Sequence, residues 1–263
     1  MDTTTDTTIT TGEDSRTVSR RTLLRSGGLA AVAGAVLAAC GGSGDHSIAR
    51  LGAGAETEPL ADVDVTDVVL LRTAMSVEKM VQDAVTSPAL ATGTLASLMN
   101  SVGAAHERAR LTLRSLVTAR NGEPVDEANA KLTANWGARA LDLVSKSDQQ
   151  EQDALLLAHA LETLVASTYQ GFVAKTSEPA LRRDMMTLAV GASRRAATIA
   201  QQIAPGTKGF VPVIDEQGNA SVAALPSAFG TLASIQVTLG APNEAGARET
   251  VTMETPSLNS YIY

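Results

Sequence analysis

The chain has 263 residues, a formal net charge of −7 and a single cysteine. Residues 1–39 contain four arginines and four acidic residues, so the whole net charge belongs to the residues that follow. An acidic chain of this kind argues against nucleic acid as a partner. One cysteine excludes an intrachain disulfide, so stability must come from a packed core. Aromatic residues make up only 3 % of the chain, and its abundant alanine, leucine and valine favour helix packing.

The N-terminal region has the features of a bacterial export signal. An apolar run of 13 residues, 27–39, is short of the roughly 20 that a membrane-spanning helix needs. Arg20 and Arg21 precede it in a segment that resembles the twin-arginine pattern, and Leu37-Ala38-Ala39-Cys40 follows it and resembles a lipobox. These residues predict a signal peptide over 1–39 and a diacylglycerol on Cys40. The alternative is a core cysteine at the end of an ordinary apolar helix.

The lipid on Cys40 implies a location and a partner. Residues 40–61 begin with Gly41-Gly42-Ser43-Gly44 and are expected to form a flexible tether. The protein is therefore expected on the extracytoplasmic face of the cell membrane, with the membrane as a partner through the anchor.

Residues 62–204 have the periodicity of four amphipathic helices. Apolar residues recur at intervals of three and four over about 65–85, 94–120, 148–175 and 179–203. Short turns join the first two helices and the last two, whereas residues 121–147 form a long connection with helical character around Trp136 and Val144. One long crossover between two helical hairpins is the connectivity of ferritin-like bundles. The predicted fold is all-α, a ferritin-like four-helix bundle.

Residues 205–263 differ from the bundle and are expected to form an extension. Five prolines interrupt it, and Ile235, Val237 and Leu239 alternate with polar residues. Residues 232–239 and 248–254 are therefore predicted to pair as a β-hairpin. Because a lone hairpin is marginally stable in water, it must pack against the bundle or another chain, and we favour the bundle.

Three polar residues fall on the apolar faces of three predicted helices: Glu78, His106 and Glu162. A buried carboxylate is costly unless it is paired, protonated or bound to metal. The three residues therefore suggest one shared polar centre. The alternative is that each lies at the edge of its apolar face and reaches water.

The same helices resemble the exported, desiccation-related type of ferritin-like protein. The similar segments cover residues 67–78, 105–125, 161–169 and 179–197, within a resemblance that spans roughly 62–203. The resemblance implies a di-iron site made by one Glu from each of two helices and a Glu-x-x-His motif from each of the other two.

Only half of that ligand set is present. Glu78 and Glu162 match the single carboxylates and His106 matches one histidine, but Gly103, Ala192 and Arg195 stand where Glu, Glu and His are expected. Since Arg stays protonated in proteins and its guanidinium suits carboxylates, Arg195 is expected to replace the metal as counter-ion. The alternative is that Arg195 extends out of the bundle to solvent.

Other polar residues add little to this centre. His159 precedes Glu162 by three residues and could extend a metal site as a His-x-x-Glu pair, but a lone helical histidine is more often a surface or packing residue, and that is the expectation here. Glu107 is expected on a solvated face with Arg110, and His46 falls in the predicted tether.

Two functions remain open from the sequence. The first is a non-catalytic domain that binds an unidentified envelope protein or ligand, requires no cofactor and has lost its di-iron site. The second is a metal-binding protein or oxidoreductase that holds iron or another divalent metal with Glu78, His106, Glu162 and water.

Overall fold

The structure is a computed structural model that describes residues 65–206, 217 and 232–263. The predicted signal peptide and tether lie outside the described residues, and with them Arg20, Arg21, Cys40 and His46. The described part of the chain is mostly helical and has one small sheet of two strands, as the sequence predicts.

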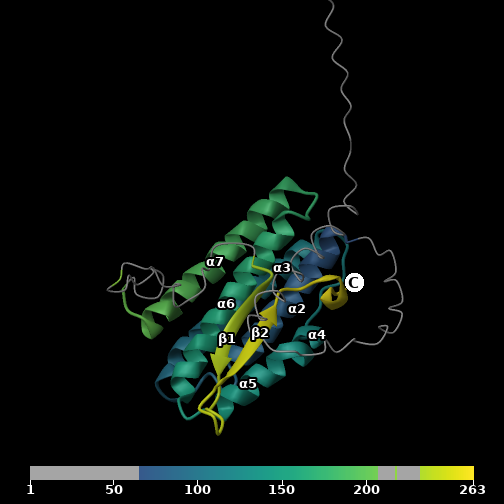
Figure 1. Ribbon diagram of the computed structural model, residues 1–263. Coiled ribbons are helices and arrows are strands. Elements are labelled where there is room, and N and C mark those ends of the chain that lie inside the picture. Colours follow the sequence, from purple (N-terminus) through teal and green to yellow (C-terminus); the bar gives the residue numbers. More distant parts are fainter. Residues whose placement is uncertain (1–64, 207–216, 218–231) are drawn as a thin grey trace, which may run out of the picture. The chain divides into compact units, whose positions relative to one another are not determined.

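Four long helices make up most of the fold (Figure 1): α2 (Asp67–Val85), α3 (Ala96–Thr118), α6 (Gln150–Val173) and α7 (Pro179–Ile203). All four lie within a few residues of the predicted ranges. Local signals define where they begin: the Thr66 side chain accepts a hydrogen bond from the Val69 amide, and Pro179 occupies the first turn of α7. A 3₁₀ turn, η1 (Gly93–Leu95), leads into α3.

The connection between α3 and α6 contains three short helical segments. They are α4 (Ala130–Leu132), a π-helical turn η2 (Thr133–Gly137) and α5 (Ala138–Ser145). Asn129 caps α4 and is completely buried, where its amide donates to Ser76 Oγ (3.0 Å) and to the carbonyl of Ser260 (2.9 Å). This side chain therefore ties the crossover to α2 and to the C-terminal segment.

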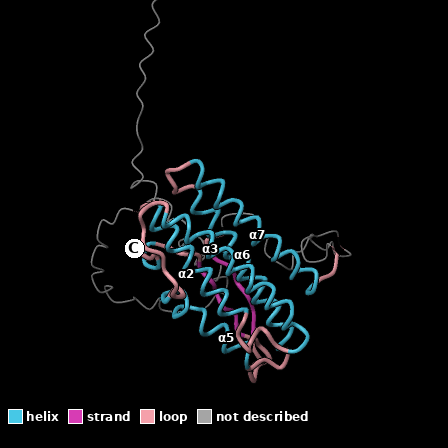
Figure 2. The backbone as a smooth tube through the Cα atoms, turned by 180° about the vertical axis from the view of Figure 1, so that it is seen from behind, coloured by secondary structure: helices cyan, strands magenta, loops and turns pink. Residues whose placement is uncertain are grey.

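The C-terminal segment forms the predicted hairpin. Strands β1 (Ser234–Leu239) and β2 (Glu249–Glu254) pair antiparallel with Val237 opposite Val251, and a short 3₁₀ turn, η3 (Leu258–Ser260), follows. One face of the hairpin is buried, through Ile235, Val237, Leu239, Val251 and Met253. The strands lie against α6 and the crossover, in front of the helices in Figure 1 and behind them in Figure 2. The hairpin thus packs on its own bundle.

A buried carboxylate fixes the end of β1. Asp153 of α6 is fully buried, accepts the Gly240 amide (2.8 Å) and pairs with Arg248, whose Nε donates to the Gly240 carbonyl (2.7 Å). Gly240 has a φ of +82°, and a Cβ there would lie 2.9 Å from Leu143 Cδ2. Only glycine fits this position without strain.

Arg248→Ala should lower the melting temperature by several degrees, because it removes the cation that pairs with the buried Asp153 and leaves that carboxylate with the Gly240 amide. Loss of a hydrogen bond to a buried charge costs about 2 kcal/mol, or roughly 4–8 °C for a domain of this size. Arg139→Ala is the matched control, since Arg139 pairs with Glu249 of the same hairpin but is half exposed. Thermal unfolding by circular dichroism tests this, and equal effects of the two changes would contradict it.

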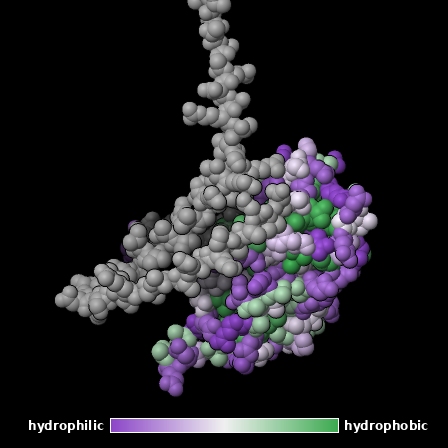
Figure 3. All heavy atoms as spheres, turned by 90° about the vertical axis from the view of Figure 1, so that its right-hand side faces the viewer, coloured by the Kyte–Doolittle hydropathy of each residue, from purple (hydrophilic) through white to green (hydrophobic). Residues whose placement is uncertain are grey.

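Polar side chains cover most of the described part of the face in Figure 3, where apolar side chains form small separate groups. Among the described residues, no helix combines the length and the apolar character needed to cross a bilayer.

Candidate functional site

The long helices bring five polar side chains together in the core. Glu78 comes from α2, His106 from α3, Glu162 and Tyr169 from α6, and Arg195 from α7. Glu78, His106 and Glu162 lie on otherwise apolar helix faces, as their spacing predicts, and each is no more than 1 % exposed. The alternative of three separate, solvated positions is therefore wrong.

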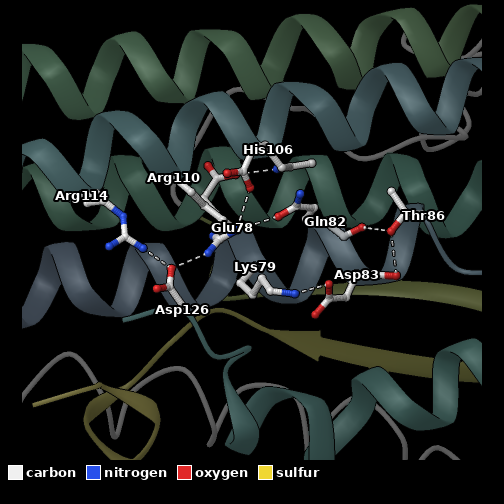
Figure 4. A network of polar contacts seen from close by, with 10 residues as sticks. Glu78, Lys79, Gln82, Asp83, Thr86, His106, Arg110, Arg114 and Asp126 are labelled. Carbon is white, nitrogen blue, oxygen red and sulfur yellow. Dashed lines mark hydrogen bonds and ion pairs between the residues drawn. The ribbon is translucent and has the colours of Figure 1, made fainter. Parts of the chain in front are cut away.

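His106 is the centre of this buried network. Its ring faces Glu78 (Figure 4), with Nδ1 2.5 Å from Glu78 Oε2, and its Nε2 lies 3.1 Å from Glu162 Oε1. Arg195 Nε donates to the same Glu162 oxygen at 2.7 Å. The Tyr169 hydroxyl donates to Glu78 Oε1 at 2.5 Å. Arg195 therefore turns into the bundle, with only 19 % of its side chain exposed.

The charges in this network balance. Burial lowers the pKa of His106, but the adjacent Glu162 and Glu78 outweigh burial and raise it from 6.5 to about 9. Burial raises the pKa of Glu162, but His106 and Arg195 outweigh burial and lower it below its ordinary value. Two carboxylates thus face an imidazolium and a guanidinium at neutral pH, which is the condition under which buried charges are tolerated.

Tyr169 was not assigned to the site from the sequence. It follows Glu162 by seven residues and so lies on the same face of α6, a spacing that could have identified it. Burial and the neighbouring Glu78 raise its pKa well above 10. The hydroxyl is therefore a permanent donor to Glu78 at physiological pH.

A second set of polar contacts lies on the outer side of α2 and α3 (Figure 4). Arg110 donates to Gln82 Oε1 (3.0 Å) and Asp126 (2.7 Å) and pairs with Glu107 (2.7 Å). Glu107 is thus a partly solvated surface residue, as expected. These contacts hold the start of the crossover against α3 and are separate from the buried network.

Two buried polar atoms beside the network have no hydrogen-bond partner among the described residues. They are Glu162 Oε2 and His159 Nε2, which belong to residues three positions apart on α6. His159 is a buried packing residue rather than a surface one, and burial lowers its pKa to about 4 despite the nearby Glu162. His159 is therefore neutral at physiological pH.

The other positions of the expected ligand set are filled by close packing. Ala192 is fully buried in α7. Gly103 lies so close to α2 that a Cβ would stand 2.5 Å from Thr86 Cγ2. A glutamate at residue 103 would therefore require a change at Thr86 as well.

His106 is not arranged as a metal ligand. A histidine ligand needs a neutral ring with one nitrogen free to coordinate, whereas both nitrogens of His106 contact carboxylates and its raised pKa keeps both protonated. Within the described ranges, no group of three or more His, Cys, Asp or Glu residues has the arrangement of a metal site. As arranged, the network is a set of ion pairs.

Comparison with protein-family models, with curated proteins and with solved structures found no match. The fold and the site thus define a helical protein with a buried, charge-balanced network at its centre.

Proposed function

We propose that the protein is a non-catalytic, ferritin-like domain in which a salt-bridged core stands where the related bundles hold a di-iron centre. The observation that carries the proposal is the position of Arg195, 2.7 Å from Glu162 and on the same oxygen that contacts His106. In this role the domain binds an envelope protein or a ligand rather than transforming one. The metal content of the purified protein tests the proposal.

The contacts at the helix ends support the ferritin-like connectivity. At one end Asp67 of α2 accepts from Thr176 (2.6 Å), before α7, and Arg120 after α3 pairs with Glu178. At the other end Glu151 of α6 accepts the amide of Thr94, before α3 (2.8 Å). Helices α3 and α6 consequently run in the same direction, so the crossover must traverse the length of the bundle, as in ferritin-like folds.

The lipoprotein part of the proposal rests on the sequence of residues 19–40. We infer that Cys40 carries a diacylglycerol and tethers the bundle to the extracytoplasmic face of the membrane. A diacylglycerol carries two acyl chains, which is enough for stable anchoring, whereas a single chain binds a membrane only marginally.

Mass spectrometry of the mature protein should find a lipidated Cys40 as its first residue, in the membrane fraction. Cys40→Ala should leave an uncleaved precursor, and replacement of Arg20 and Arg21 by lysine should block export. Cys40→Ala thus tests lipidation and cleavage, and the double lysine change tests export. An unmodified chain that begins elsewhere would refute the anchor and leave the proposal for the core intact.

The second function, metal binding or oxidoreduction, has one observation in its favour. Glu162 Oε2 and His159 Nε2 are buried without partners, and both are chemically able to coordinate a divalent metal. These two atoms supply only two ligands, and His106 could add a third only by losing a proton while it lies between two carboxylates. The ion-paired arrangement is therefore the better supported of the two.

A further inference from the structure

Asn121 is followed by Gly122, and this is the only asparagine–glycine pair in the chain. The side-chain amide of an asparagine can be attacked by the backbone nitrogen of the next residue, and glycine hinders this attack least because it has no Cβ. Asn121 is exposed, so water can reach its side chain. The pair is therefore the place in this sequence where spontaneous deamidation is chemically easiest.

The pair lies in the turn that ends α3. Asn121 has a φ of +55°, which is the left-handed conformation. Its amide donates to the carbonyl of Thr118, and the amide of Gly122 donates to the carbonyl of Val117, each at 3.0 Å. These two bonds define a Schellman motif, in which asparagine can replace the usual left-handed glycine. Both amides of the pair are thus part of the helix cap.

Close packing holds this cap in place. A Cβ at Gly122 would stand 2.6 Å from Val68 Cγ1 of α2 and 2.9 Å from Val117 Cγ1 of α3. Just before the pair, Arg120 Nε donates to Glu178 Oε1 at 3.0 Å, which ties the end of α3 to the start of α7. In the folded chain the Gly122 amide is therefore engaged as a hydrogen-bond donor and is not free to act as a nucleophile.

We propose that Asn121 is the most reactive asparagine of this chain and that the cap of α3 controls the rate of its deamidation. When the cap opens, the Gly122 nitrogen attacks Asn121 Cγ and forms a new C–N bond. The bond from Cγ to the side-chain nitrogen then breaks, and ammonia leaves with the proton of the Gly122 amide. Water opens the resulting succinimide: attack on Cγ gives aspartate, and attack on the backbone carbonyl gives isoaspartate.

Isoaspartate at residue 121 cannot rebuild the cap. It adds one methylene group to the main chain, so the Gly122 amide no longer meets the Val117 carbonyl. It also places a carboxylate at the C-terminal end of α3, where the helix dipole disfavours negative charge. The modification consequently loosens the helix end that Arg120 ties to α7, and because it is irreversible it accumulates with the age of the chain.

The test compares the full chain folded in buffer with the same chain unfolded in guanidinium chloride, both incubated at mildly alkaline pH and analysed by peptide mapping. Asn121 should be converted about 20-fold more slowly in the folded chain, the protection that two net hydrogen bonds allow. In the unfolded chain it should be converted before Asn100 and Asn259, which precede serine. Equal rates in the two states would overturn control by the cap, and faster loss of another asparagine in the unfolded chain would overturn the assigned site.

Asn121→Gly separates the modification from other effects of storage. Glycine adopts the left-handed conformation freely, so the cap should still form, but no side-chain amide remains to be lost. Deamidated wild type, isolated by anion exchange through its added negative charge, should melt at a lower temperature than the unmodified protein. Asn121→Gly should keep its initial melting temperature through the same incubation. Equal losses in both proteins would contradict the effect assigned to isoaspartate, and the comparison of the two states of the wild type does not depend on this variant.

Discussion

Arg195→Leu should lower the free energy of unfolding by about 3–5 kcal/mol, the usual cost of removing one partner of a buried ion pair. The reason is that Glu162 is fully buried and accepts from Arg195 at 2.7 Å. Without the guanidinium, two carboxylates share the single positive charge of His106. Urea unfolding at neutral pH measures the effect.

Arg194→Leu is the matched control, because it removes the same charge from the next, exposed position of α7. It should change stability by less than about 0.5 kcal/mol. The double variant Glu162→Gln with Arg195→Leu should be less destabilised than the sum of the single changes, because it removes both charges of the pair. Similar effects of Arg194→Leu and Arg195→Leu would show that Arg195 does not act through the buried carboxylate.

Stability should be greatest near pH 6.5 and fall on both sides, because the two buried histidines shift in opposite directions. The pKa of His106 is raised from 6.5 to about 9 by Glu162 and Glu78. The charged His106 therefore stabilises the fold fully below pH 6.5, and this stabilisation is lost as the pH rises through 9. The difference corresponds to about 3 kcal/mol.

The acid side depends on His159 and Glu162. Burial lowers the pKa of His159 from 6.5 to about 4. The unfolded chain binds this proton at a higher pH than the folded chain, so the free energy of unfolding falls as the pH drops from 6.5 to 4. Glu162, whose pKa is lowered by His106 and Arg195, adds a loss below its ordinary value of 4.5. Both contributions are complete above pH 6.5.

Single substitutions assign the two sides of this profile. Denaturant unfolding between pH 4 and 10 should show that His106→Gln flattens the alkaline side, while His159→Gln reduces the slope on the acid side. His106→Gln should also be less stable than the wild type at pH 6, where the wild-type imidazolium is fully formed. A wild-type profile that is flat from pH 6.5 to 9 would contradict the charged state assigned to His106.

Much of the fold could be predicted because helix periodicity is a local property. The four long helices and the hairpin follow from apolar spacing and from Pro and Gly signals at their ends. The π-turn that begins at Thr133 could not be predicted, since no residue type in the segment demands it. Asp153 was likewise missed, because its partners Gly240 and Arg248 are far away in the sequence.

The buried network was predicted in part for a similar reason. Glu78, His106 and Glu162 each interrupt an apolar face, which is visible along one helix. The shared oxygen of Glu162 and the second bond of Glu78 to Tyr169 depend on how four helices pack, and one helix does not define that. The sequence alone suggests that Gly103 marks a lost metal ligand. The structure shows that Gly103 packs so closely against Thr86 that a side chain at this position would clash with it.

The design of an iron-binding variant follows from that contact. Gly103→Glu, Ala192→Glu and Arg195→His would complete the ligand set that the family resemblance implies, and Thr86→Ala would remove the methyl group that blocks a side chain at residue 103. This fourfold variant serves as the positive control for iron uptake.

Iron binding by the wild type, measured beside that control, tests the central claim that Arg195 occupies the position of a metal. Each protein is titrated anaerobically with ferrous ion, and bound iron is counted after removal of the excess. The wild type should retain far less than one iron per chain under conditions in which the variant approaches the two of a di-iron site. Stoichiometric iron in the wild type, followed by rapid oxidation when oxygen is admitted, would contradict the claim and establish the metal-binding alternative.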